Sequence, residues 1–288
     1  MISGQTKPVG IFGCPVEQTL SPNMHNFAFE RLGINAVYLP FAVEPKHLEM
    51  ALKSLIPLGF LGINLTLPHK EAALKWVQMV SPEVEKIGAI NTVVVRRGEL
   101  VGYNTDVEGF LLSLQNDLGF RPQGKKALVF GAGGAARAAI YALAQSRIQS
   151  IIVGNRTEVR VRRLVQEFQR HFPAVSIEWF TLSEESIQKR AQQVDLIVQA
   201  TSTGMSGGAP PKISWREISK TTSVIDLVYR PPDTSFVKGA LSVGVKATGG
   251  LGMLLHQGAA SFKLWTGREM PLALVRKCLL QELSRSAS

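Results

Sequence analysis

The stretch ALVFGAGGAAR, residues 127–137, decides the fold of this chain. A short strand-like run, Ala127–Phe130, leads directly into a glycine-rich turn, and a helical pattern follows. Gly131, Gly133 and Ala136 fit the spacing G-x-G-x-x-G/A. The first glycine permits a tight turn, the second lets the backbone approach a pyrophosphate, and the small third residue lets the helix pack on the strand.

This turn predicts a phosphate-binding loop at a helix N-terminus, where the partial positive charge of the helix favours anions. A tight strand-to-helix turn that binds no ligand is the alternative. The residues expected to contact the dinucleotide are Gly131, Ala132, Gly133, Gly134 and Ala135.

The end of the next strand indicates which dinucleotide is bound. A site for NAD usually has Asp or Glu there, which binds the ribose 2′-hydroxyl. After the run Ser150–Val153 the chain instead presents Asn155, Arg156 and Thr157, with Arg160 one turn later. A guanidinium and a hydroxyl suit a 2′-phosphate, whereas ordinary solvated arginines are the alternative. NADP is therefore favoured over NAD.

Strand-like runs separated by helix-length segments continue beyond this loop, which predicts a doubly wound parallel sheet. A basic helix is expected at Val159–His171. Further strands are expected at Ser176–Phe180, Val194–Gln199, Ser223–Leu227 and Val245–Ala247.

The first third of the chain has a βαβ pattern with an appended hairpin. Ser21 is expected to cap a helix that has Pro22 at its first position and Gly33 just past its end. Strands are expected at 8–13, Ala36–Phe41 and Gly62–Leu67, helices at His47–Leu55 and Lys70–Val80, and a hairpin at Thr92–Arg96 and Leu100–Tyr103.

Two helical stretches without a further strand, Met253–Trp265 and Leu272–Leu283, finish the chain. They must pack on something already formed, and the N-terminal unit is the expected place. The sequence therefore predicts an α/β protein in which an N-terminal α/β domain, residues 1–106 with 250–288, is joined to a Rossmann-like domain, residues 107–249.

Composition excludes several classes of protein. Hydrophobic residues make up 45% of the 288 residues and charged residues 19%, so the chain can bury a core. Two cysteines cannot build a disulfide framework, which favours the cytoplasm. The five histidines have no metal-ligand spacing, so no metal is expected.

The formal net charge of +10 attracts anions without identifying them: nucleic acid, a membrane or a phosphorylated small molecule. No long Lys/Arg run and no apolar stretch of membrane length occurs. The prediction is a small-molecule substrate, with no nucleic-acid partner and no membrane.

Polar residues interrupt apolar runs at several strand ends. Asn64, Thr66 and Lys70 lie at and after one of them, Asn91 begins another, and Asp106 follows the hairpin. Ligands bind at the carboxyl ends of strands in open α/β sheets, and reduction of a carbonyl needs a proton donor. Taken singly, each residue also fits a turn, a cap or a solvated surface.

The chain resembles the shikimate/quinate dehydrogenase family over nearly its whole length. The segments that carry the resemblance are GCPVEQTLSPNMHN (13–26), GINLTLPHK (62–70), GAINTVV (88–94), GYNTDVEGF (102–110), GAGGAAR (131–137), NRT (155–157), ATSTGM (200–205), DLVYRPPDT (226–234) and GGLGMLLHQGAASFKLW (249–265).

The resemblance implies reversible NADPH-dependent reduction of 3-dehydroshikimate to shikimate in aromatic amino-acid biosynthesis, by a monomer or homodimer. The first domain would bind the substrate and the second NADP. Lys70 and Asp106 would be the catalytic pair. Other substrate contacts would be Thr19, Ser21, Asn64, Thr66, Asn91, Tyr229 and Gln257. Beyond the loop and the phosphate clamp, NADP would meet Thr203, Met205, Val228, Gly250 and Met253.

Two positions depart from the family's pattern. Thr19 stands where serine is usual, and Gln199 stands where asparagine is usual. The methyl group of Thr19 leaves quinate open as a substrate. The alternatives are a quinate/shikimate dehydrogenase of broader substrate use, a non-catalytic NADP-binding regulator and, from charge alone, a nucleic-acid binder.

Overall fold

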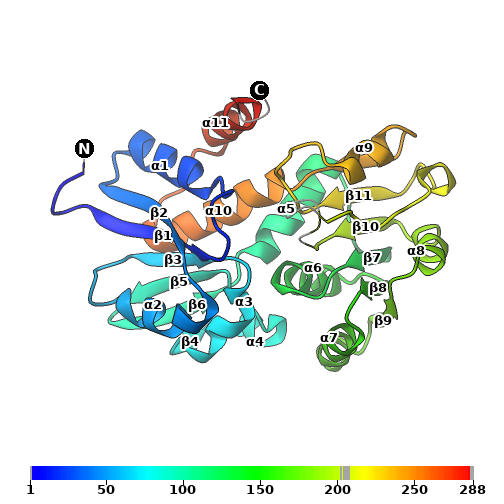
Figure 1. The fold of residues 1–288 in the computed structure, drawn as a ribbon, viewed down its shortest axis with the longest axis horizontal. Helices are drawn as coiled ribbons and strands as arrows, with labels where there is room; N and C mark the ends of the chain where they lie inside the picture. Colours follow the sequence, from blue (N-terminus) through cyan, green and yellow to red (C-terminus); the bar gives the residue numbers. More distant parts are fainter. Residues whose placement is uncertain (1, 202, 204–207, 286–288) are drawn as a thin grey trace. The chain divides into compact units, whose positions relative to one another are not determined.

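A computed structural model describes residues 2–201, 203 and 208–285 of the chain. The chain divides into two compact units, one made of Met1–Gly109 with Leu254–Ser288 and the other of Phe110–Met253 (Figure 1). The two divisions fall inside helices α5 (Asp106–Leu118) and α10 (Leu251–Thr266).

The first unit is built on a six-stranded sheet with the order β2-β1-β3-β5-β6-β4. Strands β2, β1 and β3 are parallel, whereas β5 runs antiparallel to both β3 and β6. Its strands are β1 (Lys7–Gly13), β2 (Ala36–Ala42), β3 (Gly62–Leu65), β4 (Met79–Val80), β5 (Thr92–Arg96) and β6 (Glu99–Tyr103). Its further helices are α1 (Ser21–Leu32), η1 (Pro45–His47), α2 (Leu48–Ser54), α3 (His69–Ala72), η2 (Ala73–Lys75), α4 (Pro82–Ile87) and α11 (Leu272–Arg285).

Apolar layers lie on both faces of this sheet. On one face Leu48 and Leu52 of α2 pack with Ile63 and Leu65 of β3. On the other face the indole of Trp265, in α10, donates to the Val93 carbonyl over 3.1 Å. The C-terminal helix α10 thus packs on the first sheet, as the sequence predicted.

The second unit is a parallel sheet with the order β12-β11-β10-β7-β8-β9. Counted from β7 in chain order, this is the doubly wound order 3-2-1-4-5-6. Its strands are β7 (Lys126–Phe130), β8 (Ser150–Asn155), β9 (Ser176–Thr181), β10 (Leu196–Gln199), β11 (Ser223–Asp226) and β12 (Lys246–Thr248). Its helices are α6 (Gly134–Gln145), α7 (Glu158–His171), α8 (Glu184–Ala191), η3 (Trp215–Glu217) and α9 (Ser235–Leu241).

Helices cover both faces of the second sheet. Ile187 of α8 and Phe236 of α9 share a core with Leu128, Phe130 and Ile197. Helices α6 and α7 lie on the opposite side (Figure 1). The expected α/β class and Rossmann-like second domain are confirmed, and the strand order locates a switch point between β7 and β10, where such sheets bind ligands.

Two local expectations were wrong. Ser21 is not the N-cap of α1 but its first residue, and the N-cap, Leu20, makes no side-chain capping bond. The expected helix Lys70–Val80 is broken into α3, η2 and β4. Its last two residues, Met79 and Val80, pair with β6, where Met79 lies opposite Val101, and sheet pairing there overrides helical spacing.

Candidate active site

The first unit holds an ion pair between two residues that the sequence singled out. Lys70 lies in α3, just beyond the end of β3, and Asp106 is the first residue of α5. The Lys70 Nζ donates to Asp106 Oδ2 over 2.6 Å. The Lys70 side chain is 18% exposed and that of Asp106 is 5% exposed. The carboxylate is thus held inside the protein, whereas the lysine side chain is partly exposed.

Asn91 fixes the other oxygen of this carboxylate. Its Nδ2 donates to Asp106 Oδ1 over 2.9 Å, and its Oδ1 accepts from the Thr105 backbone N–H over 2.8 Å. Both carboxylate oxygens therefore have a partner, which sets the plane of the carboxylate and the position from which it holds the lysine. Gln257 of α10 joins the same group, with its Oε1 3.3 Å from Asn91 Nδ2.

A buried chain of polar side chains continues behind the pair. Asn64 Nδ2 donates to Thr92 Oγ1 over 3.0 Å and to Ser261 Oγ over 3.1 Å. Its Oδ1 accepts from the Tyr38 hydroxyl over 2.8 Å. The Ser261 hydroxyl also lies 3.0 Å from that of Thr105. Strands β2, β3 and β5 and helix α10 are thus joined in one network.

Tyr38 and Ser261 of this network were not among the predicted site residues. In the sequence, Tyr38 looks like an ordinary inward-facing residue of a strand. Ser261 lies 197 residues from Asn64, so the sequence does not connect the two. The only signal for either is the position of Ser261 inside the segment 249–265.

Thr19, in the loop that follows β1, and Ser21, the first residue of α1, form a second polar group in the first unit. The Thr19 hydroxyl donates to Ser21 Oγ over 3.2 Å, and the Ser21 backbone N–H donates to Thr19 Oγ1 over 3.2 Å. Because β1 and β3 are parallel neighbours, this loop starts at the same sheet edge as the segment bearing Lys70. Cys14 N donates to Leu67 O over 3.0 Å, which joins the two segments directly.

Thr66 and His69 shape the segment between β3 and the lysine. Thr66 is half-buried, and its carbonyl accepts from the His69 backbone N–H over 2.8 Å. The His69 ring is buried with Nε2 2.7 Å from the Val43 carbonyl, and burial lowers the pKa of the ring. A neutral ring that donates here anchors the start of α3, one residue before Lys70.

The second unit carries the glycine-rich loop at its switch point. Gly131 has φ of 115°, in the left-handed region, and a Cβ there would lie 2.9 Å from the Ala200 carbonyl oxygen. Only glycine fits this turn, which leads from β7 to α6 and lies against Ala200 just after the end of β10. Gly133 is the N-cap of α6 and offers no side-chain cap, so the first backbone N–H groups of α6 are free of such a partner. These features fit the phosphates of a dinucleotide.

One basic residue after β8, Arg160, contacts this loop. Arg160 Nε donates to the Ala132 carbonyl over 3.1 Å, while Arg156 and Thr157 are exposed. Asn155 Nδ2 donates to the Thr157 carbonyl over 3.1 Å. No carboxylate occupies Asn155–Thr157, and Glu158 is the first residue of α7. The surroundings suit a 2′-phosphate better than a free ribose hydroxyl.

The remaining predicted cofactor positions follow β10, β11 and β12. Thr203 is half-buried, Val228 is 1% exposed and Met253 is 6% exposed. Tyr229, a predicted substrate contact, also follows β11 and is half-buried. Gly250 is buried and its N–H donates to the Val228 carbonyl over 3.0 Å. Met205 lies outside the described residues.

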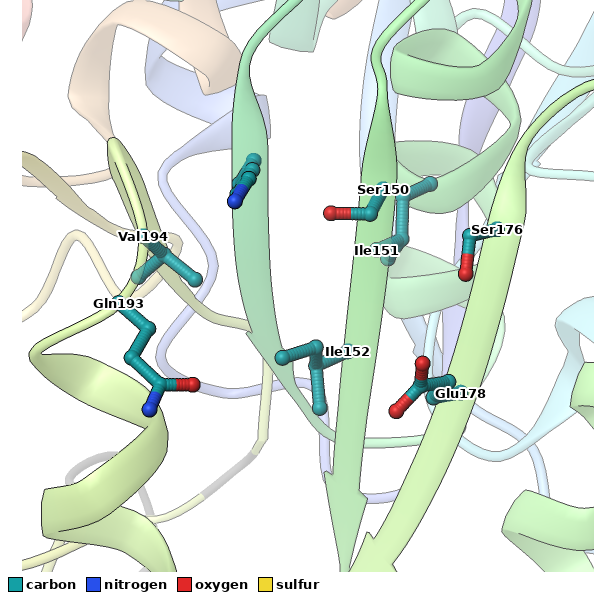
Figure 2. Close-up of a pocket in the computed structure, with 8 residues that line it drawn as sticks. Ser150, Ile151, Ile152, Ser176, Glu178, Gln193 and Val194 are labelled. Carbon is teal, nitrogen blue, oxygen red and sulfur yellow. The ribbon is translucent and has the colours of Figure 1, made fainter.

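A separate cavity of about 180 Å³ opens at the opposite edge of the second sheet (Figure 2). Lys126, Ser150 and Ser176, which line it, are the first residues of β7, β8 and β9. The glycine-rich loop follows the carboxyl end of β7, so this cavity is not part of the candidate site.

Within residues 2–201, 203 and 208–285, no group of three or more His, Cys, Asp or Glu side chains could hold a metal ion. In the same part of the chain, no helix has the length and apolar content needed to cross a membrane.

Three family models match successive parts of the chain. The shikimate dehydrogenase substrate binding domain matches residues 11–93, shikimate / quinate 5-dehydrogenase matches 114–206, and the shikimate 5′-dehydrogenase C-terminal domain matches 250–280.

Relatives match the chain over nearly its full length. A shikimate dehydrogenase (NADP(+)) from Methanopyrus kandleri is 41% identical over 284 residues, 98% of each chain. A crystal structure of a shikimate dehydrogenase with NADP+ is 33% identical and has a TM-score of 0.89 over 98% of each chain. The Thermus thermophilus enzyme with NADP(H) and shikimate is 36% identical, with a TM-score of 0.83 over 96% of this chain and 99% of that one.

The fold and the two polar sites define a two-unit α/β protein of the dehydrogenase class, with a doubly wound unit that carries a dinucleotide-type loop. Given these matches, the chain belongs to the shikimate dehydrogenase family.

Proposed function

We propose that this chain reduces 3-dehydroshikimate to shikimate with NADPH, reversibly, in the biosynthesis of aromatic amino acids. It is an oxidoreductase that acts on a CH–OH group. The observation that carries the proposal is the Lys70–Asp106 pair, a half-buried ammonium held at 2.6 Å by a buried carboxylate. Reduction of a ketone creates an alkoxide, and a positioned ammonium can neutralise it as it forms.

In this mechanism Lys70 donates a proton to the substrate oxygen that becomes the new hydroxyl, and accepts it in the reverse direction. NADPH supplies the hydride to the carbonyl carbon. Asp106 holds the ammonium in place, and with its acceptor capacity it orients a neighbouring hydroxyl of the ring. Asn91 maintains the plane of the Asp106 carboxylate.

The Thr19 and Ser21 hydroxyls bind the substrate carboxylate. They lie beside one another where the loop after β1 enters α1, and both can donate to one anion. Further contacts to the ring hydroxyls come from Asn64, Thr66, Asn91, Tyr229 and Gln257. Several neutral donors and acceptors in one site suit a small polyhydroxylated acid better than an apolar ligand.

NADP binds to the second unit, residues 107–249 in the predicted division, and the substrate to residues 1–106 with 250–288. Gly131–Ala135 hold the pyrophosphate, and Asn155, Arg156, Thr157 and Arg160 hold the 2′-phosphate. The segments bearing Thr203, Met205, Val228, Gly250 and Met253 line the nicotinamide half. Support comes from the left-handed Gly131, from the uncapped start of α6 and from the absence of a carboxylate at Asn155–Thr157.

Quinate is the second candidate substrate, and Thr19 is the residue that favours it. Its extra methyl group lies in the carboxylate loop, where it changes the space beside the ring. Cytoplasmic location, a monomer or homodimer and the lack of a nucleic-acid partner stay predictions from the sequence.

An assay of reduced nicotinamide absorbance, with NADP+ and NAD+ each crossed with shikimate and quinate, tests the proposal. We expect the highest kcat/KM for NADP+ with shikimate. A higher kcat/KM for quinate would make the second candidate correct. Tight ligand binding without turnover in any combination would favour the non-catalytic regulator.

A further inference from the structure

Two buried polar residues end neighbouring strands of the second sheet. Gln199 is the last residue of β10 and Asp226 the last of β11, and the two are register partners. Gln199 is 0% exposed and Asp226 is 1% exposed. The residues before them in the core, Leu196–Val198 and Val224–Ile225, are apolar. The core thus becomes polar at its carboxyl edge, beside the switch point.

The Gln199 amide folds back the loop that follows its own strand. Its Nε2 donates to the hydroxyl oxygens of Thr201 and Thr203, both over 2.8 Å. Its Oε1 accepts from the Thr201 backbone N–H over 3.2 Å. One side chain therefore sets the conformation of the backbone at Thr201 and the position of Thr203.

The Asp226 carboxylate does the same for the loop after β11. Its Oδ1 accepts from the Val228 N–H over 3.1 Å, and its Oδ2 accepts from the Thr234 hydroxyl over 2.7 Å. Thr234 also caps α9, where its oxygen accepts from the Val237 N–H over 3.2 Å. Among the described residues no cationic side chain pairs with Asp226. Burial raises the pKa of this carboxyl to about 6.

Backbone hydrogen bonds connect the two loops to each other and to the segment before α10. The Leu227 N–H donates to the Gln199 carbonyl over 2.9 Å, and the Gly250 N–H donates to the Val228 carbonyl over 3.0 Å. Displacement of either side chain is therefore transmitted to Thr203, Val228 and Gly250 together.

Apolar side chains would fill this part of the core without desolvation of an amide or a carboxylate. A buried polar group lowers stability unless it is hydrogen-bonded, and a buried charged group lowers it further. Gln199 and Asp226 stand at the ends of their strands, and the side-chain hydrogen bonds given above all go to residues of the loops that follow. We therefore take their contribution to be the conformation of those loops.

We propose that Gln199 and Asp226 are positioning residues that set the nicotinamide half of the cofactor site without affecting the adenosine half. This inference rests on the proposed function, in which Thr203, Val228 and Gly250 line the nicotinamide. Hydride transfer requires close approach of two carbon atoms, and a misplacement of about 1 Å can lower the rate about 100-fold. The adenosine phosphate contacts, in contrast, come from the loops after β7 and β8.

The test compares turnover with binding of 2′,5′-ADP, a fragment that contains only the adenosine half. Gln199→Leu and Asp226→Asn keep the side-chain volume while they remove the amide or the charge. We expect kcat with NADPH and 3-dehydroshikimate to fall at least tenfold in both. The Kd for 2′,5′-ADP should stay within twofold of the wild-type value.

Thr234 supplies a graded version of the same test. Thr234→Val, which removes the hydroxyl that Asp226 accepts from, should lower kcat, whereas Thr234→Ser should restore it. The matched control is Thr222→Val, because the buried Thr222 hydroxyl donates to the Val194 carbonyl over 3.0 Å at the other end of β11. This control should leave kcat and the Kd for 2′,5′-ADP unchanged within twofold.

Parallel losses of turnover and of 2′,5′-ADP affinity would overturn the inference, because they would indicate general damage to the unit. Unchanged kcat in folded Gln199→Leu and Thr234→Val would also overturn it. A wild-type protein that does not oxidise NADPH with 3-dehydroshikimate would refute the proposed function instead.

Discussion

At the level of single residues, the geometry of the site depends on which partner each polar atom hydrogen-bonds. Asp106 gives one oxygen to Lys70 and the other to Asn91, and the Asn91 oxygen is held by the Thr105 backbone. The Lys70 side chain is 18% exposed, whereas that of Asp106 is 5% exposed. In the proposed mechanism, this arrangement preorganises a proton donor before any substrate arrives.

Lys70, Asp106, Asn64 and Asn91 could be predicted because polar residues stood out at strand ends. Ser261 could not, because one small polar residue in an apolar helix has several ordinary explanations. Its role exists only where α10 packs on β3 and β5, which is a tertiary contact. Tyr38 was missed for the same reason, since its hydroxyl reaches Asn64 across the sheet.

His25 gives a prediction about stability and pH. The ring is 0% exposed, neither ring nitrogen has a hydrogen-bond partner, and Tyr38 stacks on it at 4.4 Å. Burial lowers its pKa from 6.5 to about 3. Between these values the unfolded chain binds a proton that the folded chain does not, so stability is lost as pH falls below about 6.5.

From pH 7 to pH 5 this residue should remove about 2 kcal/mol of unfolding free energy. The nontitrating His25→Leu should lose correspondingly less over the same interval, whatever its stability at pH 7. Urea unfolding of both proteins at the two pH values measures the difference. Equal pH dependence in both proteins would show that His25 is not responsible.

Asp226 has the opposite effect on the pH dependence of stability. Its raised pKa adds stability that is lost as pH rises through about 6.

At the level of helices and strands, sheet pairing determines the secondary structure at the place where the sequence pattern predicted a helix wrongly. EAALKWVQMV has helical spacing, but Gln78 N donates to Leu100 O over 3.0 Å and the chain joins β6 as strand β4. The parallel strands of the second sheet were predicted well, because continuous apolar runs between turn residues leave few alternatives. The short helices α4, α8 and α9 were not predicted, since each has too few turns for a clear periodicity.

Gly62 in β3 tests how tightly the helix α10 packs on the first sheet. A Cβ at this position would overlap the Val93 carbonyl oxygen and the Trp265 indole. Gly62→Ala should therefore destabilise the protein by about 1–3 kcal/mol, as overpacking usually does. The matched control is Gly4→Ala, where no atom lies within 4 Å of the new Cβ. Thermal unfolding measures both, and equal melting temperatures would contradict the packing described.

We expect the segment between β8 and α7 to determine the choice of cofactor. Arg156→Ala should raise the KM for NADPH about 10- to 100-fold, because a hydrogen bond to a charged group is worth about 1.5–3 kcal/mol. The KM for NADH should change little, since NADH lacks the 2′-phosphate. Arg162→Ala is the control, because Arg162 is an exposed arginine of the helix that follows, α7. Equal changes for NADPH and NADH in Arg156→Ala would refute the phosphate clamp.

At the scale of the whole molecule, the chain combines two sheets with different tasks. The second sheet is entirely parallel and ends at a loop that suits phosphates, whereas the first mixes parallel and antiparallel strands around a buried polar network. The positions of glycine and proline, together with apolar runs, sufficed to predict the α/β class and the Rossmann-like parallel sheet. The hydrogen-bond partners within each site could not be predicted, because they depend on register and packing.

The turnover of Lys70→Ala measures whether Lys70 is the proton donor. The exposed Lys75→Ala, five residues along the chain, is its control. General acid catalysis contributes about 10²–10⁴-fold, so kcat for 3-dehydroshikimate reduction should fall by that factor in Lys70→Ala and stay unchanged in Lys75→Ala. A Lys70→Ala protein that binds substrate and NADPH and keeps near wild-type kcat would contradict the central claim.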